Sequence, residues 1–125
     1  MPGFLLADKI DIGTGRGKEI RFHRDFAPEG ANANFITCIG EDEIAIRTYE
    51  RGVEDETLAC GTGSIAAALV ASLMTDWTSP ISLTTRSREL LTIYFREDNG
   101  VFTDVYLEGD ARLIYTGELN QDGWK

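Results

Sequence analysis

The stretch "TGSIAAALVASLM", residues 62–74, constrains the fold most strongly because it is predicted to be a helix with almost no polar face. Alanine and leucine, the best helix formers, fill its interior, and Thr62 or Ser64 can cap its start. Only Ser72 is left to face water. A helix that is apolar all round is buried all round, so we expect strands to wrap it rather than to lie on one side.

The segments on both sides of this helix are predicted to be β-strands. Residues 42–51 alternate apolar Ile44 and Ile46 with polar neighbours, which is typical of a half-buried strand. The sequence therefore predicts an α+β fold, a mostly antiparallel β-roll or barrel wrapped around one central apolar helix. The other predicted strands are 34–40, 81–87, 89–97, 100–109 and 111–119.

The chain of 125 residues has the length of a single domain. We expect residues 1–18 to form a flexible leading segment, residues 19–119 the domain, and residues 120–125 a tail. The leading segment contains "GTGRGK", whose glycine spacing differs from that of a dinucleotide-binding loop, and no apolar helix follows it. It is therefore interpreted as a loop or hinge.

Composition excludes several classes of function. The net charge is −9, from 21 acidic and 12 basic residues, which disfavours binding to nucleic acid or to an anionic membrane surface. No transmembrane segment or signal peptide is predicted, and two cysteines are too few for a disulfide framework, so a reduced, cytoplasmic setting is the default. With His23 as the only histidine, no metal site is expected.

Cys60, in "ETLACGTGS", stands at the start of the apolar helix. Unpaired N–H groups and the positive end of the helix dipole favour a thiolate at such a position. The same N–H groups, left open by Gly61 and Gly63, can bind a carboxylate. The alternative is that Cys60 packs as a small apolar residue, as free cysteines usually do. Cys38, inside a predicted strand, is expected to be such a core residue.

Three motifs together resemble one known family. "TYERGVEDETLACGTG" is similar to the sequence around the second catalytic cysteine of diaminopimelate epimerases, "PEGANANF" resembles their substrate-loop asparagine motif, and "YLEGDARLIYTGEL" is similar to their closing strands. The resemblance covers residues 17–119. The order of the Glu-Arg-Gly and Ala-Cys-Gly-Thr-Gly motifs makes it highly specific.

The resemblance implies a cofactor-independent epimerase that interconverts LL- and meso-diaminopimelate on the route to lysine and peptidoglycan. Such enzymes have two pseudo-symmetric domains, each a β-structure around a helix, and two cysteines that face the α-carbon from opposite sides. Taken without the motif, Glu50 and Arg51 would be interpreted as a surface pair and Asn32 as a turn residue. Carried over residue by residue, the resemblance implies a catalytic Cys60 and the substrate-binding residues Asn32, Glu50, Arg51, Gly61 and Thr62.

The chain departs from the family pattern in ways that matter. A complete enzyme of this family is about twice as long, in the two-domain range. The first-domain cysteine with its Gly-Asn-Gly turn, the N-terminal asparagines and the Gly-Asn-Pro-His segment are absent from the sequence. Two smaller differences are interpreted as tolerated variation: "VEDET" is one residue longer than the commonest form, and Asp110 replaces a usual proline. The chain is therefore expected to be the C-terminal half, inactive by itself, with apolar surface that favours self-association.

Two other interpretations stay open at this point. The chain could be one part of a split epimerase whose N-terminal half is a separate protein, or a non-catalytic binding module that forms a homodimer. The substrate could also be another amino acid racemised by a related enzyme, although Arg51 and Asn32 favour a substrate with two carboxylates.

Overall fold

A computed structural model describes residues 3–6, 16–50, 52–57 and 60–124. Within these residues, seven strands form one mixed sheet in the order β1-β2-β3-β5-β6-β7, with β4 paired to β3. The β1–β2 and β3–β5 pairs are parallel, and the other pairs are antiparallel. The strands are β1 (Gly3–Leu6), β2 (Ala33–Gly40), β3 (Glu43–Glu50), β4 (Asp55–Thr57), β5 (Ile81–Thr84), β6 (Leu90–Asp98) and β7 (Val101–Glu108).

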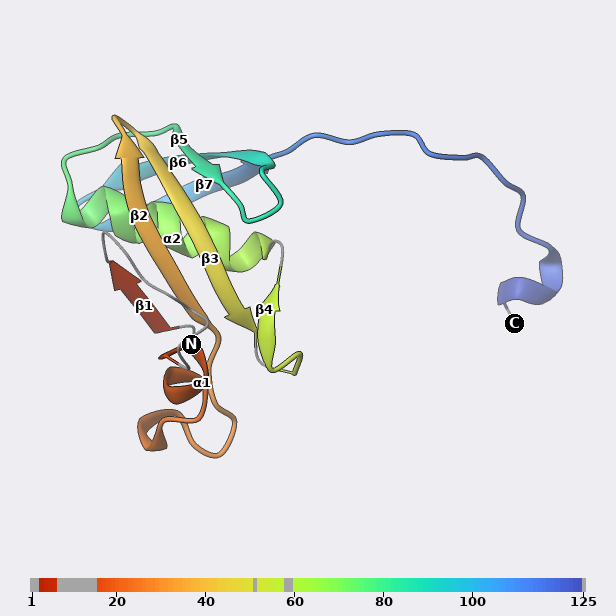
Figure 1. Ribbon diagram of the computed structural model, residues 1–125. Helices are drawn as coiled ribbons and strands as arrows, with labels where there is room; N and C mark the ends of the chain where they lie inside the picture. Colours follow the sequence, from red (N-terminus) through yellow and green to blue (C-terminus); the bar gives the residue numbers. More distant parts are fainter. Residues whose placement is uncertain (1–2, 7–15, 51, 58–59, 125) are drawn as a thin grey trace.

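The apolar helix is confirmed as α2 (Gly61–Met74), and it contacts strands from both halves of the sheet. Figure 1 shows α2 crossing between the long β2–β3 pair and the β5–β7 strands. Its buried alanines, Ala67, Ala68 and Ala71, allow the helix to approach the strands closely, because their side chains are small. The core around them contains the fully buried Ile36, Ile44, Ile81, Leu83 and Ile93.

The α+β class is confirmed, but the sheet does not close into a barrel. β1 and β7 stand at opposite ends of the strand order and do not pair with each other. Since the sheet stays open, the last turn of α2 is not covered, and Leu73 and Met74 are exposed. The expectation that the helix is buried all round is therefore wrong at its C-terminal end.

Short elements near the N-terminus support the start of β2. Helix α1 (Arg16–Arg21) places Ile20 against a small second cluster of Ala33, Phe35 and Tyr49. A 3-10 turn, η2 (Arg24–Phe26), follows α1, and the exposed His23 caps it. β1, α1 and η2 are not predicted from the sequence, because these short segments lack a clear apolar periodicity.

Residues 109–124 contain no strand, so the strand predicted over residues 111–119 is wrong. Residues 109–120 contain neither helix nor strand, and a short 3-10 turn, η3 (Gln121–Trp124), follows them. Figure 1 shows this tail running away from the body of the molecule. Its apolar side chains face solvent, with Leu113, Ile114, Tyr115 and Leu119 between 77% and 89% exposed. Apolar alternation gives a segment the propensity for a strand, but a strand forms only beside a hydrogen-bonding partner.

The remaining predicted strands are confirmed with small changes at their ends. Residues 34–40, 42–51, 81–87, 89–97 and 100–109 correspond to β2, β3, β5, β6 and β7. No helix among the described residues is long and apolar enough to cross a membrane.

Candidate active site at the start of helix α2

Cys60 is the residue that caps the N-terminus of α2, in place of the predicted Thr62 or Ser64. Its backbone is extended, with φ −144° and ψ 112°, and its side chain accepts no capping hydrogen bond from the helix. The thiol is half-buried, and its Sγ lies 3.6 Å from Oγ1 of Thr62. We call residues 60–64 the Cys60 turn.

The outer side of the Cys60 turn is open to a ligand. Gly61 and Thr62 are exposed, and a Cβ at position 61 would meet only Cδ1 of Leu107, at 3.9 Å. The first N–H groups of a helix have no acceptor within the helix, and the side chain of Cys60 does not cap them. Together with the positive end of the helix dipole, they form a site that can bind a carboxylate.

The inner side of the Cys60 turn is fixed by Ser64. This residue is fully buried, and both of its donors bond the same atom. Its Oγ donates to the carbonyl oxygen of Cys60 at 2.8 Å, and its backbone N–H donates to that oxygen at 2.9 Å. These two hydrogen bonds fix the backbone of Cys60 on the buried side of the turn, and its side chain is left to face outward.

Gly63 brings the Cys60 turn into direct contact with the sheet. A Cβ at this position would lie 2.6 Å from Oδ1 and 3.2 Å from Nδ2 of Asn34 in β2. Such a distance is a clash, so only glycine fits here. The two glycines of "CGTG" therefore differ: Gly61 leaves the outer surface open, and Gly63 permits close packing underneath.

Asn34 itself belongs to a buried polar pair. It is 1% exposed, and its Oδ1 accepts a hydrogen bond of 2.8 Å from the hydroxyl of Thr48 on β3. Its Nδ2 is the buried side-chain nitrogen that finds no hydrogen-bond partner among the described residues. A buried donor without an acceptor costs about 1–3 kcal/mol, so its presence beside the Cys60 turn calls for a reason.

A buried carboxylate ties β4 to the sheet just before the Cys60 turn. The side chain of Glu56 is 7% exposed, and Arg47 of β3 donates to both of its oxygens at 2.6 Å. Arg86 lies 3.4 Å from the same carboxylate. Two-point binding of this kind gives a guanidinium–carboxylate pair a defined geometry. β4 is held against β3, and the segment that leads to Cys60 starts from a fixed point.

Two of the predicted residues, Asn32 and Glu50, come from neighbouring strand ends of the sheet. Ala33 pairs with Tyr49, so Asn32, which precedes β2 and is half-buried, lies at the same end of the β2–β3 pair as the backbone of Glu50. The Cys60 turn rests on Asn34, two positions along the chain from Asn32. Arg51 lies outside the described residues.

Several residues of this site were missed by the sequence analysis, namely Asn34, Thr48, Ser64, Arg47 and Glu56. Asn34 and Thr48 are polar residues on inward-facing positions of strands, and this is a signal that could have been used. Cys38 was interpreted wrongly as a core residue, because it lies near the end of β2 and is exposed. Cys60 is therefore the half-buried thiol of the chain, and Cys38 the exposed one.

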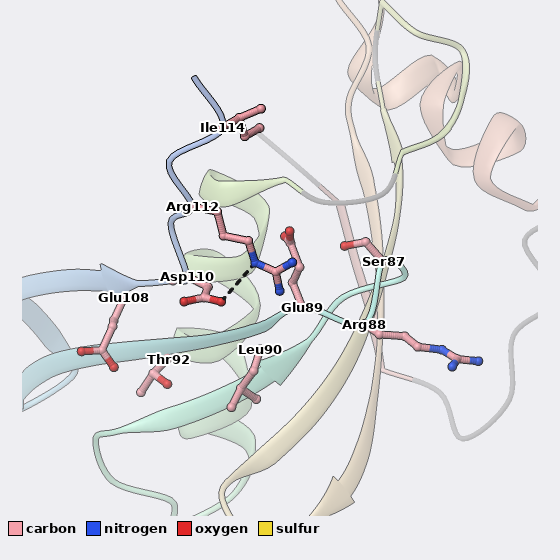
Figure 2. A pocket seen from close by; sticks show the side chains of 10 residues that line it. Ser87, Arg88, Glu89, Leu90, Thr92, Glu108, Asp110, Arg112 and Ile114 are labelled. Atoms are coloured by element: carbon pink, nitrogen blue, oxygen red, sulfur yellow. Dashed lines mark ion pairs between the residues drawn. The ribbon is translucent and has the colours of Figure 1, made fainter. Parts of the chain in front are cut away.

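A groove of about 960 Å³ lies elsewhere, between the start of the tail and β6. Figure 2 shows charged side chains around it and an ion pair between Arg112 and Asp110. The Nε atom of Arg112 lies 3.8 Å from Oδ2 of Asp110. None of the predicted site residues that the structure describes lines this groove. Its lining residues are Ser87, Arg88, Glu89, Leu90, Thr92, Glu108, Gly109, Asp110, Arg112 and Ile114.

The described residues offer no group of three histidine, cysteine, aspartate or glutamate side chains that could hold a metal ion. At the Cys60 turn, the thiol lies beside the first backbone N–H groups of α2. A thiol beside open N–H groups at a helix start is the arrangement expected of a class of protein in which a cysteine acts next to a bound anion.

Comparison with known proteins identifies the family to which the chain belongs. The sequence profile of diaminopimelate epimerase matches residues 7–114, and the chain belongs to that family. It is 47% identical to the diaminopimelate epimerase of Aquifex aeolicus (strain VF5) over an alignment of 127 positions. This alignment covers 98% of this chain and 44% of that protein. It is 42% identical to the enzyme of Chlorobaculum tepidum, over 90% of this chain and 42% of that protein. The chain thus spans less than half the length of the curated relatives that it matches.

Proposed function

We propose that this chain supplies one half of the active site of a cofactor-independent amino-acid epimerase, with diaminopimelate as the substrate. Cys60 is the acid–base residue of this half. The proposal is carried by one observation, a half-buried thiol at the open N-terminus of α2 in a chain of the diaminopimelate epimerase family. The names of the relatives support the choice of substrate.

The chemistry follows from the position of the thiol. The α-proton of an amino acid is only weakly acidic, so its removal requires that the negative charge left behind be stabilised. The Cys60 thiolate takes the proton, and the electron pair of the broken C–H bond delocalises into the α-carboxylate. The N–H groups of Gly61 and Thr62 stabilise the carboxylate as its charge grows. A second thiol on the opposite face then gives a proton to the α-carbon, which inverts the configuration.

The other proposed residues hold the rest of the substrate. Asn32 lies at the end of the β2–β3 pair and binds polar groups of the substrate as an amide donor and acceptor. Glu50 binds the substrate near the reacting centre. Arg51 binds the distal carboxylate through two parallel hydrogen bonds, the geometry that guanidinium groups favour.

One thiol cannot serve both faces of an α-carbon, so we propose that catalysis needs a second half-domain with its own cysteine. The exposed apolar tail, with Leu113, Ile114, Tyr115 and Leu119, supports a partner that covers this surface. The chain alone is expected to be inactive. Two alternatives differ from this proposal. In a split enzyme, a separate chain that carries the N-terminal half restores turnover. A non-catalytic homodimer has no turnover to restore.

Exchange of the α-proton of diaminopimelate in deuterated water tests the proposal. We expect no exchange with the chain alone. We expect exchange when it is mixed with the part of the Aquifex aeolicus relative that it does not span, and loss of that exchange in Cys60→Ser. Cys38→Ser is the matched control and should retain full exchange. Exchange that survives Cys60→Ser would contradict the proposed role of Cys60, and exchange by the chain alone would contradict the requirement for a second half.

A further inference from the structure

The side chain of Arg21, the last residue of α1, contacts two loops at one end of the sheet. One is residues 27–32, which lead into β2, and we call it the Asn32 loop. The other is residues 52–54, between β3 and β4, and we call it the β3–β4 turn. Both loops lie at the same end of the β2–β3 pair, because Ala33 pairs with Tyr49. Helix α1 contacts β2, β3 and β4, and Figure 1 shows it near this end of the pair.

Arg21 holds the β3–β4 turn through the carboxylate of Glu54. Its Nε and Nη2 atoms donate to Oε1 of Glu54 at 3.2 and 2.9 Å, and the N–H of Gly52 donates to the same oxygen at 3.1 Å. Gly52 and Glu54 have φ angles of +92° and +59°, and this left-handed conformation is unfavourable for a glutamate. Arg21 therefore stabilises a conformation that the turn does not favour by itself.

Arg21 also occupies the space beside the Asn32 loop. Its Nη1 atom donates to the carbonyl oxygen of Glu29 at 3.5 Å, and its backbone carbonyl accepts from the N–H of Ala31 at 3.3 Å. A Cβ on Gly30, where φ is +75°, would overlap the Nη1 atom of Arg21, so the glycine leaves open the space that the guanidinium fills. The side chain of Arg21 is 12% exposed, and it joins one loop to the other.

We propose that Arg21 is a positioning residue for substrate binding. It holds the Asn32 loop and the β3–β4 turn together, so that Asn32 on one side and the preceding Glu50 and Arg51 on the other meet the substrate in one arrangement. This inference rests on the proposed function, which assigns these residues to the substrate. Loops that are already ordered have a smaller entropy cost when the substrate binds, so Arg21 favours binding rather than proton transfer.

The concentration dependence of α-proton exchange from diaminopimelate tests this role, with the chain mixed as above with the part of the Aquifex aeolicus relative that it does not span. Arg21→Ala is expected to raise KM about two- to five-fold, the effect of a partly exposed charge pair, and to leave kcat unchanged. Arg21→Lys keeps the charge and should restore part of the loss. Arg24→Ala is the matched control, because it removes the same charge from a side chain that is 93% exposed and lies 3.8 Å from the neighbouring Asp25. Its KM should not change.

Amide hydrogen exchange of the chain alone, followed by NMR at single residues, tests the two contacts without any turnover. Arg21→Ala should speed exchange in both loops, at Ala31 and at Gly52. Glu54→Ala should speed it at Gly52 alone, because the contact of Arg21 with the Asn32 loop is kept. In the kinetic experiment, Arg21→Ala combined with Glu54→Ala should raise KM no further than Arg21→Ala does, because the two side chains act as one pair.

An unchanged KM in Arg21→Ala would overturn the proposal, and so would a fall in kcat at constant KM or additive effects of Arg21→Ala and Glu54→Ala. Unchanged amide exchange at Ala31 or at Gly52 in Arg21→Ala would overturn it as well. If circular dichroism shows that Arg21→Ala is unfolded, Arg21→Lys and Glu54→Gln make the same comparison with side chains of nearly the same size. A mixture without turnover in the unsubstituted chain means that the proposed function fails; turnover with the KM of Arg21→Ala unchanged means that this inference alone fails.

Discussion

Gly63 of α2 rests on the side-chain amide of Asn34 in β2, so closely that a Cβ at position 63 would lie 2.6 Å from Oδ1. This contact joins the helix that carries Cys60 to the strand that follows Asn32. The distance between the thiol and the proposed substrate-binding end of the sheet is thus set by a glycine and an asparagine. Neither residue was expected to have that role.

Gly63→Ala is expected to destabilise the fold, because the new methyl group clashes with the Asn34 amide. Overpacking of this kind costs about 1–3 kcal/mol, more than the gain in helix propensity from alanine. The free energy of unfolding in urea measures the effect. Gly61→Ala is the matched control, since a Cβ there has only a contact of 3.9 Å and should leave the stability unchanged or raise it. Equal effects of the two variants would show that the contact is not tight.

Arg47→Ala is expected to weaken the attachment of β4. It removes two hydrogen bonds of 2.6 Å from the buried carboxylate of Glu56, and bonds to charged groups contribute about 1.5–3 kcal/mol. Thermal and urea unfolding measure the loss. The control is Arg96→Ala, because Arg96 and Asp104 form an exposed pair of 3.5 Å that should contribute less than about 1 kcal/mol. A loss no larger in Arg47→Ala than in the control would contradict this role of Glu56.

The phenol of Tyr94 is expected to titrate above its ordinary pKa of 10.0. The negative charge of Glu108 on β7 raises this pKa, and desolvation and the 3.2 Å hydrogen bond from the phenol to the Glu108 carboxylate raise it further. Because the pKa is higher in the folded state, the stability from this pair is complete below the unfolded pKa of 10.0 and is lost as the pH rises through the folded value.

Ultraviolet absorbance of tyrosinate measures this titration. Glu108→Gln should shift one phenol toward lower pH, and Tyr94→Phe should remove that phenol from the curve. A titration curve that is the same with glutamine at position 108 would rule out the interaction.

Removal of the tail after Asp110 is expected to leave the stability of the domain almost unchanged. The apolar residues of the tail are mostly exposed, so they contribute little to the core. The truncated chain should also self-associate less, because a large exposed apolar surface is gone. Sedimentation velocity over a range of concentrations measures the association. The 125-residue chain with Leu113→Asp and Ile114→Asp is a control of unchanged length and should resemble the truncated chain. A full chain that stays monomeric at high concentration would contradict the prediction.

Local patterns in the sequence determined the elements that carry the site. Alanine and leucine from residue 65 onward specify α2, and apolar alternation specifies β3 and β6, because the period of a helix or strand is a local property of the chain. Three local motifs, the one around Cys60 with its preceding Glu-Arg-Gly, the asparagine motif and the closing segment, together identified the family, since each is a short run of consecutive residues.

Only the tertiary structure decided how these elements meet. The contact between Asn34 and Gly63 depends on which strand face receives the helix, and no local pattern carries that information. For the same reason, the exposure of Cys38 and the open last turn of α2 were not foreseen. The segment 111–119 has the alternation of a strand but no strand beside it, because pairing is a property of two segments and sequence propensity belongs to one.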